Sequence, residues 1–247
     1  MQFQRTSQLL GQEAFERIRQ SFVVVVGLGA VGGQAAEALV RAGVGRLRLV
    51  DHDTVRESNL NRQIFATWDS LGQKKAAVAE KRIRSISPDC QVEALDTFVH
   101  RDTLDQILAG DPDVVIDAID SMNPKVELLT ELICRKQTAI SSMGAALRLD
   151  PAKIRVGDLA EVTHCPLAAI LRKQLRNRQV EPHIPCVYSN EETRLLHHEA
   201  VFPPDETEVH LQEKGRRRFS LGSLPTITGI FGLTAAHWVL MQLGGRW

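Results

Sequence analysis

Aromatic residues are scarce in this sequence of 247 residues: they make up 5% of it, and Tyr occurs once. This scarcity argues against an interface built from base-stacking platforms. The charge is also balanced, because 30 basic and 30 acidic side chains cancel. A zero balance does not indicate a general nucleic-acid binder, although a local basic patch can still dock one. The length suits one large α/β domain or two small ones.

The sequence contains no C-x-x-C motif. Its four cysteines, Cys90, Cys134, Cys165 and Cys186, are widely spaced, which argues against a zinc knuckle and against a disulfide framework. We interpret Cys186 as a structural thiol, because reactivity requires a lowered pKa. A secretory signal is also missing, since charged residues come before any apolar region. We therefore expect a cytoplasmic protein.

Charged residues are absent from residues 221–245, a stretch that is long enough to span a bilayer. The stretch contains several glycines, Pro225 and polar side chains such as Thr226 and Gln242. A soluble core or a dimer interface tolerates these residues better than lipid does. We expect this segment to be buried in protein and expect no contact with a membrane.

An uninterrupted apolar run, residues 22–26, leads directly into Gly27, Gly29 and Gly32. The run lacks polar alternation, which predicts a strand covered on both faces, as in a parallel sheet. Gly27 permits a tight turn, Gly29 lets the backbone approach a phosphate, and Gly32 lets the next helix pack closely. The first amides of that helix favour an anion. The stretch predicts a nucleotide site, with a glycine turn kept only for packing as the alternative.

A second predicted strand, residues 47–51, ends in Asp51, about 20 residues beyond the glycines, where a carboxylate can bind both ribose hydroxyls. The polar loop that follows contains Asn59, Asn61 and Arg62. Long loops after sheet strands commonly carry function, and a planar guanidinium can clamp a polyphosphate. An ordinary surface loop is the alternative. These residues leave open whether the nucleotide is a nicotinamide, a flavin or ATP.

Lys74 and Lys75 lie in the first turn of a helix predicted at residues 72–86. Lysines at a helix N-terminus interact unfavourably with the helix macrodipole, so an anion from outside the helix or solvent must stabilise their charge. We expect one of them to reach a phosphate; two solvated lysines are the alternative.

A third predicted strand, residues 113–118, places Asp117 and Asp120 at the carboxyl edge of the sheet, where open α/β sheets bind ligands. Asp120 could hold Mg²⁺ together with phosphate oxygens. We interpret Asp117 as structural. The next helix is predicted at residues 124–136, with Asn123 as its cap and Pro124 at its first position.

The remaining predicted elements are a strand at residues 92–95 and helices at residues 8–20, 102–108 and 166–178. The first of these helices is expected to bury Leu9, Phe15 and Ile18. The helix at residues 166–178 is expected to have Leu167, Ile170, Leu171 and Leu175 on one side and a dense basic face on the other. Residues 214–218 form a second basic cluster. Together they hint at a polyanionic partner, although such faces are often only solvated.

Five motifs, GLGAVGG, LVDHDTV, SNLNRQ, GQKKA and DAIDS, occur in this order between residues 3 and 144. In order and spacing they resemble the ubiquitin-activating (ThiF/MoeB-like) superfamily, which includes the adenylyltransferases of molybdopterin-synthase and thiamine biosynthesis. The resemblance implies a Rossmann-like, doubly wound, mainly parallel sheet with a less regular C-terminal extension. It implies one domain over residues 1–247, with a nucleotide-binding core at 1–148 and a substrate and dimer extension at 149–247.

The resemblance also implies ATP and Mg²⁺ as cofactors and gives the motif residues expected roles. Gly29 would lie against the phosphates, Asp51 would bind the ribose, and Arg62 and Lys75, rather than Lys74, would neutralise the triphosphate. Asp120 would be the Mg²⁺ carboxylate. The implied nucleotide contacts are Gly27, Gly29, Gly32, Asp51, Asp53, Ser58, Asn59, Asn61, Arg62, Lys75, Asp120 and Ser121, together with Arg5. Arg5, by itself an ordinary terminal charge, would reach the active site of a partner subunit, which implies a homodimer.

Members that adenylate a ubiquitin-like protein usually carry two zinc-binding C-x-x-C pairs, which this sequence lacks. The segments VTHCPLAAILRKQLR and IPCVYSNEE and the apolar tail resemble the tRNA threonylcarbamoyladenosine dehydratases. This resemblance implies a tRNA substrate whose modified adenosine is adenylated on its carboxylate and then cyclised. One alternative is an adenylyltransferase for a ubiquitin-like sulfur carrier, with a sulfur-transfer partner and a thioester on Cys186. Another is a NAD-binding oxidoreductase or a nucleotide sensor.

Overall fold

A seven-stranded sheet, in the order β3-β2-β1-β4-β5-β7-β6, forms the centre of the computed structural model, which describes residues 2–192 and 221–245. All neighbouring strands are parallel except β6, which pairs antiparallel with β7. The strands are β1 Phe22–Val26, β2 Arg46–Val50, β3 Gln91–Leu95, β4 Val114–Asp117, β5 Ala139–Ser142, β6 Ile154–Asp158 and β7 Pro185–Ser189. The prediction of a mainly parallel α/β sheet is confirmed.

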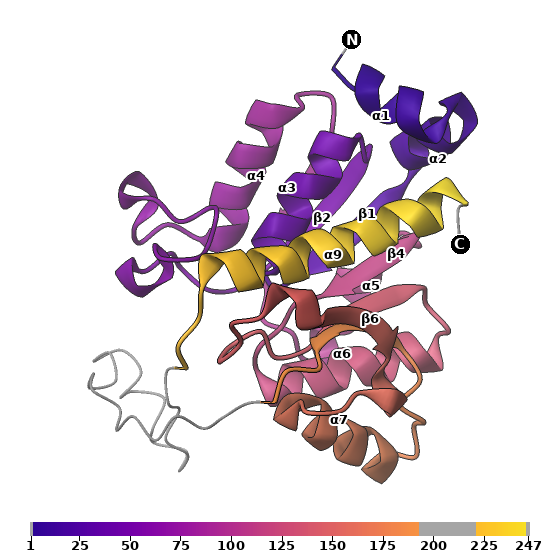
Figure 1. Cartoon of the computed structure of the whole chain (residues 1–247). Helices are drawn as coiled ribbons and strands as arrows, with labels where there is room; N and C mark the ends of the chain where they lie inside the picture. The colour runs from indigo at the N-terminus through magenta and orange to yellow at the C-terminus, as the bar shows by residue number, and fades with distance from the viewer. Residues whose placement is uncertain (1, 193–220, 246–247) are drawn as a thin grey trace.

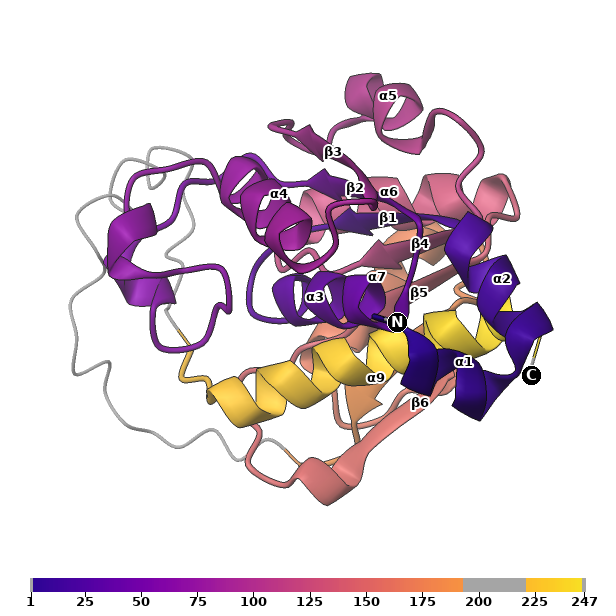
Figure 2. The same cartoon turned by 90° about the horizontal axis from the view of Figure 1, so that it is seen from above.

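Helices cover both faces of the sheet, as Figures 1 and 2 show. Val23 and Val25 of β1 belong to one apolar core, shared with α2, α3, α4 and α9, whereas Val24 and Val26 belong to a second core, shared with α5, α6 and α7. Every residue of β1 is buried, which explains the apolar run without alternation. The helices are α1 Gln4–Leu10, α2 Gln12–Gln20, α3 Gly32–Ala42, α4 Lys75–Ile86, α5 Leu104–Leu108, α6 Met122–Cys134, α7 Pro166–Asn177 and α9 Pro225–Gly244.

The N-terminal helix predicted at residues 8–20 is wrong in one respect, because the chain breaks at Gly11 into α1 and α2. Gly11 has a φ of +87°, a conformation that an α-helix does not contain. The break turns α1 away from the core and leaves the side chain of Leu9 81% exposed, whereas Ile18 of α2 is fully buried. The expected burial of Leu9 is therefore also wrong.

Two other helix predictions need correction at single positions. Ser121, rather than Asn123, is the residue that precedes the first turn of α6. In α7, Ile170 is 47% exposed, although its spacing suggested the apolar side, and Ala168 takes the buried place. In both helices the local sequence pattern predicts that a helix forms. It does not predict the exact residue at which the helix begins or which side of it is buried.

The charge-free segment forms α9, which runs across the face of the sheet beside α3 and also contacts α2, β5 and β7 (Figure 1). It is long and apolar enough to cross a membrane, yet 56% of its most apolar window is buried inside the protein. Phe231, Ala235 and Val239 are fully buried in the core. The expected burial in protein is confirmed. The basic cluster predicted at residues 214–218 lies outside the described residues.

Candidate active site

Three loops meet at the carboxyl edge of the central strands β2, β1 and β4, which are neighbours in the sheet. The glycine turn follows β1, the long polar loop follows β2, and residues 118–121 follow β4. All the predicted site residues except Arg5 lie in these loops or in the first turn of the helix after them. The structure thus brings the predicted residues to one edge of the sheet, where open α/β sheets bind ligands.

The glycine turn is closely packed at two of its three positions. Gly27 has a φ of +89°, and a Cβ there would lie 2.7 Å from the carbonyl oxygen of Ala118. A Cβ on Gly32 would lie 1.8 Å from the carbonyl oxygen of Gly27, so α3 can start this close to β1 only with glycine. At Gly29 the nearest atom to such a Cβ is Nε2 of Gln63, at 3.8 Å. The chain itself therefore does not require a glycine at position 29, and the space beside it is open for the predicted approach to a phosphate.

Asp51 joins the glycine turn to the polar loop. Its Oδ2 accepts a hydrogen bond from the amide of Leu28 at 2.7 Å, and its Oδ1 accepts one from the amide of Asp53 at 2.8 Å. This structural role was missed by the sequence analysis, because it depends on two backbone amides rather than on a side-chain pattern. A carboxylate has further lone pairs, so the role leaves room for the predicted ribose contact.

Lys75 points into the polar loop, where its ammonium lies 2.9 Å from Oδ2 of Asp53. Burial by itself would raise the pKa of Asp53, but the charge and hydrogen bond of Lys75, helped by His52, lower it below its usual value. Lys74 turns outward instead and pairs with Asp96 at 3.0 Å. The two lysines are therefore not equivalent: Lys75 is 7% exposed and faces the loop, whereas Lys74 lies on the surface.

Arg62 carries a positive charge that, among the described residues, forms no ion pair. Its Nη1 donates to the carbonyl of Ser58 at 2.9 Å and to Oδ1 of Asn61 at 2.8 Å. The amide of Asn61 in turn reaches the carbonyl of Ser223, just before α9. Asn59 is buried and accepts a hydrogen bond from the loop backbone. The loop thus holds a guanidinium in place without neutralising it, which suits an outside anion.

The loop after β4 carries Asp120, which is exposed and accepts a hydrogen bond from the hydroxyl of Ser121 at 3.4 Å. A buried cluster below it fixes this loop. Lys125, fully buried, donates to Oδ2 of Asp117 at 2.6 Å and to the carbonyl of Ile119 at 3.1 Å. The amide of Ile119 donates to Oδ1 of Asp117 at 3.1 Å. Asp117 is therefore structural, as predicted.

Lys125 is a residue that the sequence analysis missed. It lies in the first turn of α6, where a lysine is normally solvated, and its partner is eight positions away on β4. The hydroxyl of Ser141 on β5 completes the cluster, since it donates to Oδ2 of Asp117 at 2.6 Å. The sequence did contain a signal for this cluster. Asp117 and Ser141 are polar residues near the ends of two neighbouring parallel strands, and such ends meet at one edge of the sheet.

The structure does not bring Arg5 to the other predicted residues within one chain. Arg5 is exposed on α1, which packs on α2, and Arg17 of α2 donates to the carbonyl of Gly244 at the end of α9. The polar loop lies at the opposite end of α9, beside Ser223. Figure 1 shows α1 and this loop on either side of the molecule. α9, with 20 residues, is about 30 Å long.

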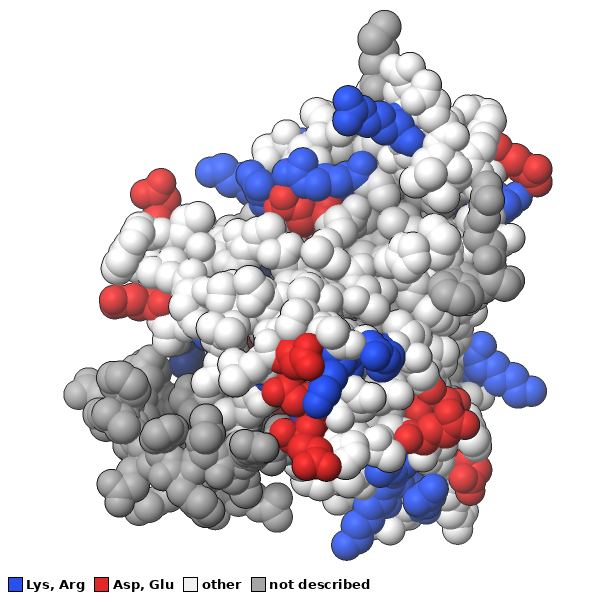
Figure 3. All heavy atoms as spheres, viewed as in Figure 1, with Lys and Arg blue, Asp and Glu red and all other residues white. Residues whose placement is uncertain are grey.

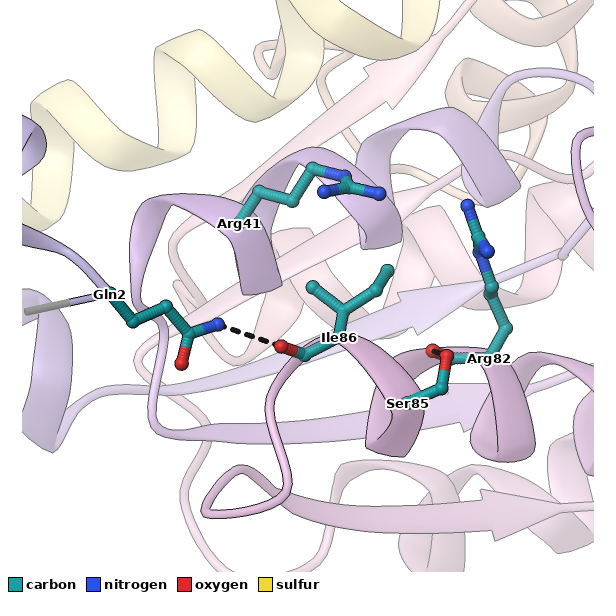
Figure 4. Close-up of a pocket in the computed structure, with 5 residues that line it drawn as sticks. All are labelled: Gln2, Arg41, Arg82, Ser85 and Ile86. Atoms are coloured by element: carbon teal, nitrogen blue, oxygen red, sulfur yellow. Dashed lines mark hydrogen bonds between the residues drawn. The ribbon is translucent and has the colours of Figure 1, made fainter.

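Two cavities lie away from this edge. One, of about 430 Å³, is drawn in Figure 4 and is lined by Gln2, Arg41, Arg82, Ser85 and Ile86. Both of its arginines hydrogen-bond to the carboxylate of Glu37, which is 6% exposed. Burial alone would raise the pKa of Glu37, but the hydrogen bonds and charges of Arg82 and Arg41 lower it. The single carboxylate of Glu37 thus compensates one of the two positive charges at this cavity.

The second cavity, of about 330 Å³, lies where β5 and β7 begin, at the edge of the sheet opposite the three loops. Cys186 of β7 is fully buried, and burial, with Asp158 nearby, raises the pKa of its thiol to about 12. A thiol in this state is neither accessible nor ionised near neutral pH. The interpretation of Cys186 as a structural residue agrees with this burial, and a thioester at Cys186 does not.

Comparison with known proteins adds a family and several relatives. The model of the ThiF family matches residues 2–246. The chain is 34% identical to the tRNA threonylcarbamoyladenosine dehydratase of Bacillus subtilis, over 93% of this chain and 90% of the relative. It is 35% identical to the enzyme of that name from Escherichia coli, over 98% of this chain and 92% of the relative.

Solved structures agree with these matches. The structure of the Escherichia coli dehydratase in complex with ATP superposes with a TM-score of 0.85 at 33% identity, and the match covers 99% of this chain and 94% of that one. The sulfur carrier protein adenylyltransferase of Thermus thermophilus is 40% identical, but over 45% of this chain and 41% of the relative.

Proposed function

The chain belongs to the ThiF family, and on that premise we propose that it is an ATP-dependent tRNA threonylcarbamoyladenosine dehydratase. The observation that carries the proposal is the extent of the similarity. The dehydratases match over 93% and 98% of the chain, whereas the sulfur carrier adenylyltransferase matches over 45%. The matched length thus includes most of the chain beyond the nucleotide motifs, where the substrate would be distinguished.

The reaction begins at the carboxylate of the threonylcarbamoyl group on the tRNA. This carboxylate attacks the α-phosphorus of ATP, pyrophosphate leaves, and an acyl adenylate forms. A nitrogen of the same modified nucleoside then attacks the activated carbonyl carbon and displaces AMP, which closes a ring. The nucleoside loses one water overall, whose oxygen leaves in AMP. Because the ring closure is intramolecular, no protein nucleophile is needed, which is consistent with the buried thiol of Cys186.

The three loops would act by positioning and by charge neutralisation. The amides at the start of α3 and the open space at Gly29 receive phosphate oxygens, and Gly27 and Gly32 keep that turn in place. Arg62 and Lys75 offset the negative charge that the leaving pyrophosphate carries. Asp51 holds the turn and binds the ribose hydroxyls. Ser58, Asn59, Asn61, Asp53 and Ser121 complete the predicted nucleotide contacts.

Asp120 suits a Mg²⁺ ion, because its carboxylate is exposed at the same edge and such ions are commonly held by one or two carboxylates and phosphate oxygens. When bound, the ion would supply positive charge to the phosphates. Asp51, His52 and Asp53 also bring three ligand-type atoms within 4.8 Å of one another. Asp51 and Asp53 are already engaged by backbone amides and by Lys75, which favours Asp120 as the ligand.

A homodimer would complete the site. Arg5 lies at the end of α9 that is far from its own polar loop, so a second copy is needed to bring an Arg5 to this loop. Two leucines offer apolar surface for such a contact: Leu9 beside Arg5 is 81% exposed, and Leu233 on α9 is 50% exposed. Figure 3 shows a band without charged side chains across the middle of the molecule, where α9 lies in the same view of Figure 1.

The decisive experiment is incubation of the protein with ATP, Mg²⁺ and tRNA that carries threonylcarbamoyladenosine. Mass spectrometry of the digested tRNA is expected to show the loss of one water from that nucleoside, with AMP and pyrophosphate formed in equal amounts. A reaction without ATP is the control. ATP turnover without a mass change would reject the tRNA substrate but keep the adenylating activity.

The sulfur-carrier alternative has a separate test. A small protein that ends in Gly-Gly is added with ATP, and pyrophosphate exchange is measured. No stimulation is expected. Stimulation by the carrier, together with an unchanged tRNA, would replace the proposal with this alternative. Binding of NAD in preference to ATP would instead favour an oxidoreductase or a nucleotide sensor.

A further inference from the structure

Helix α7 carries a run of positive charge that the proposed chemistry does not use. Residues 165–180 contain Arg172, Lys173, Arg176 and Arg178 and no acidic residue. The helix buries Ala168, Leu171 and Leu175. At 100° per residue, Lys173 falls opposite this apolar stripe, and Arg176, 60° from Lys173 around the helix, lies on the flank between that face and the stripe. Both are exposed. Figure 3 shows Lys and Arg side chains gathered at the lower end of the molecule, where α7 lies.

The exposed cations of α7 differ in their pairing from those of the other helices. Exposed arginines on other helices pair with a glutamate one turn away, as Arg41 of α3, Arg84 of α4 and Arg135 of α6 do. Lys173 and Arg176, by contrast, form no ion pair with the residues that the structure describes. Glu161 and Glu181 are exposed beyond either end of the helix. The C-terminal half of α7 therefore presents a positive charge that is open to an outside partner.

The helix is firmly held in its place. Nη1 of Arg172 donates to the carbonyls of Leu159 at 3.1 Å and Val162 at 2.7 Å, which ties α7 to the turn before it. The apolar stripe of α7 belongs to the core that also contains β1 and α6. A fixed helix presents its charges at fixed positions, so binding an extended anion costs little ordering of the protein.

The position of α7 relates it to the candidate active site. A Cβ on Gly144, in the loop after β5, would lie 3.9 Å from Sγ of Cys165 and from Cβ of Leu167. β5 is the neighbour of β4, whose loop carries Asp120. α7 thus begins at the active-site edge of the sheet and runs away from it. At 1.5 Å per residue, Lys173 and Arg176 lie about 10 to 15 Å along the helix from its start.

We propose that the exposed face of the C-terminal half of α7, with Lys173 and Arg176, binds the phosphate backbone of the tRNA substrate. The inference rests on the proposed function for the identity of the RNA. A nucleotide that enters the active site is flanked by further backbone phosphates, and α7 carries its cations away from that same edge. Contacts to phosphates need cations rather than rings, which agrees with an aromatic content of 5%.

The test compares the variant Lys173→Gln/Arg176→Gln with a control of equal charge, Lys81→Gln/Arg101→Gln, which removes two exposed cations elsewhere. Equilibrium binding of tRNA to the full chain is measured at several KCl concentrations. The α7 variant is expected to bind about 2- to 30-fold more weakly, because exposed ion pairs contribute about 0.2 to 1 kcal/mol each. The slope of log Kd against log salt is expected to fall by about 1.4 to 1.8. ATP affinity is expected to stay unchanged.

A salt slope equal to that of the control variant would overturn the proposal. The same variants are also tested with vesicles of phosphatidylserine. If the α7 variant lost binding to these vesicles while its tRNA binding matched the control, the face would belong to a membrane surface and the proposal would be wrong. Conversion of the tRNA is scored separately. If the wild-type protein bound tRNA through α7 but did not dehydrate it, the proposed function would be wrong and the proposed docking surface would stand.

Discussion

The substitution Lys125→Met tests how the loop that carries Asp120 is held. Methionine keeps most of the length of the side chain but removes the cation. Lys125 and Asp117 are both fully buried and lie 2.6 Å apart, so the change leaves a carboxylate enclosed without its counter-ion. The hydroxyl of Ser141 and the amide of Ile119 remain as its partners. The substitution therefore removes one buried ion pair and the hydrogen bond from Lys125 to the carbonyl of Ile119.

The expected cost is large. Removing one partner of a buried ion pair typically costs about 3 to 5 kcal/mol, while a whole domain has a free energy of unfolding of about 5 to 15 kcal/mol. Lys125→Met is thus expected to lose about a fifth of the stability or more. Urea unfolding followed by circular dichroism measures this loss as a lower midpoint at an unchanged m-value. The matched control is Lys81→Met on the exposed side of α4, which is expected to change stability by about 0.5 kcal/mol or less.

The double variant Lys125→Met/Asp117→Asn separates the cost of leaving a buried charge unpaired from the cost of the changed packing. It leaves no unpaired buried charge, so we expect it to be more stable than Lys125→Met alone. If Lys125→Met unfolded within about 1 kcal/mol of the wild type, the pair would not hold the loop and the reasoning would be refuted.

The substitution Arg62→Ala is expected to lower the rate of AMP formation by about two orders of magnitude or more, because one charge-stabilising donor is lost; near-normal turnover would contradict its role. Gly29→Ala is expected to leave the urea midpoint unchanged, since the nearest atom to the new Cβ is 3.8 Å away, and to weaken ATP binding, which calorimetry measures. Gly32→Ala is expected to lower the urea midpoint, since its Cβ would lie 1.8 Å from a carbonyl oxygen. The opposite order would refute this packing argument. Glu37 has a pKa below its usual value in the folded chain. The ionised carboxylate therefore contributes fully to the free energy of unfolding above the unfolded pKa of about 4.3, and this contribution is lost as the pH falls through the folded pKa. Glu37→Gln is therefore expected to be less stable than the wild type at pH 7 and to approach it in acid urea titrations; a gap that did not change with pH would argue against this charge effect.

Much of the nucleotide-binding core could be predicted from the sequence, because its signals are local. The apolar run of β1 indicates burial on both faces, and the glycines after it mark the turn. The carboxyl ends of parallel strands lie at one edge, so the loops after β1, β2 and β4 had to meet. The roles of the predicted residues in binding ATP and Mg²⁺ stay predictions.

The features that escaped the sequence analysis depend on partners far away along the chain. Lys125 is buried because Asp117 and Ser141 lie on two strands beside it, and neither the helical period of α6 nor its composition indicates this. The role of Asp51 depends on the amide of Leu28, 23 positions earlier. Leu9 is exposed because one glycine redirects α1, although the apolar spacing continues through it. A local pattern gives the element, and the tertiary neighbours decide which face is covered.

The placement of α9 also has a consequence for how the protein is made. β1 leaves the ribosome early, but α9, which covers the same side of the sheet together with α3, follows roughly 200 residues later. At synthesis rates of about 5 to 20 residues per second, this delay is about 10 to 40 s. During that time the nascent polypeptide keeps an apolar surface uncovered, and a surface of this kind promotes aggregation until α9 has been made and covers it.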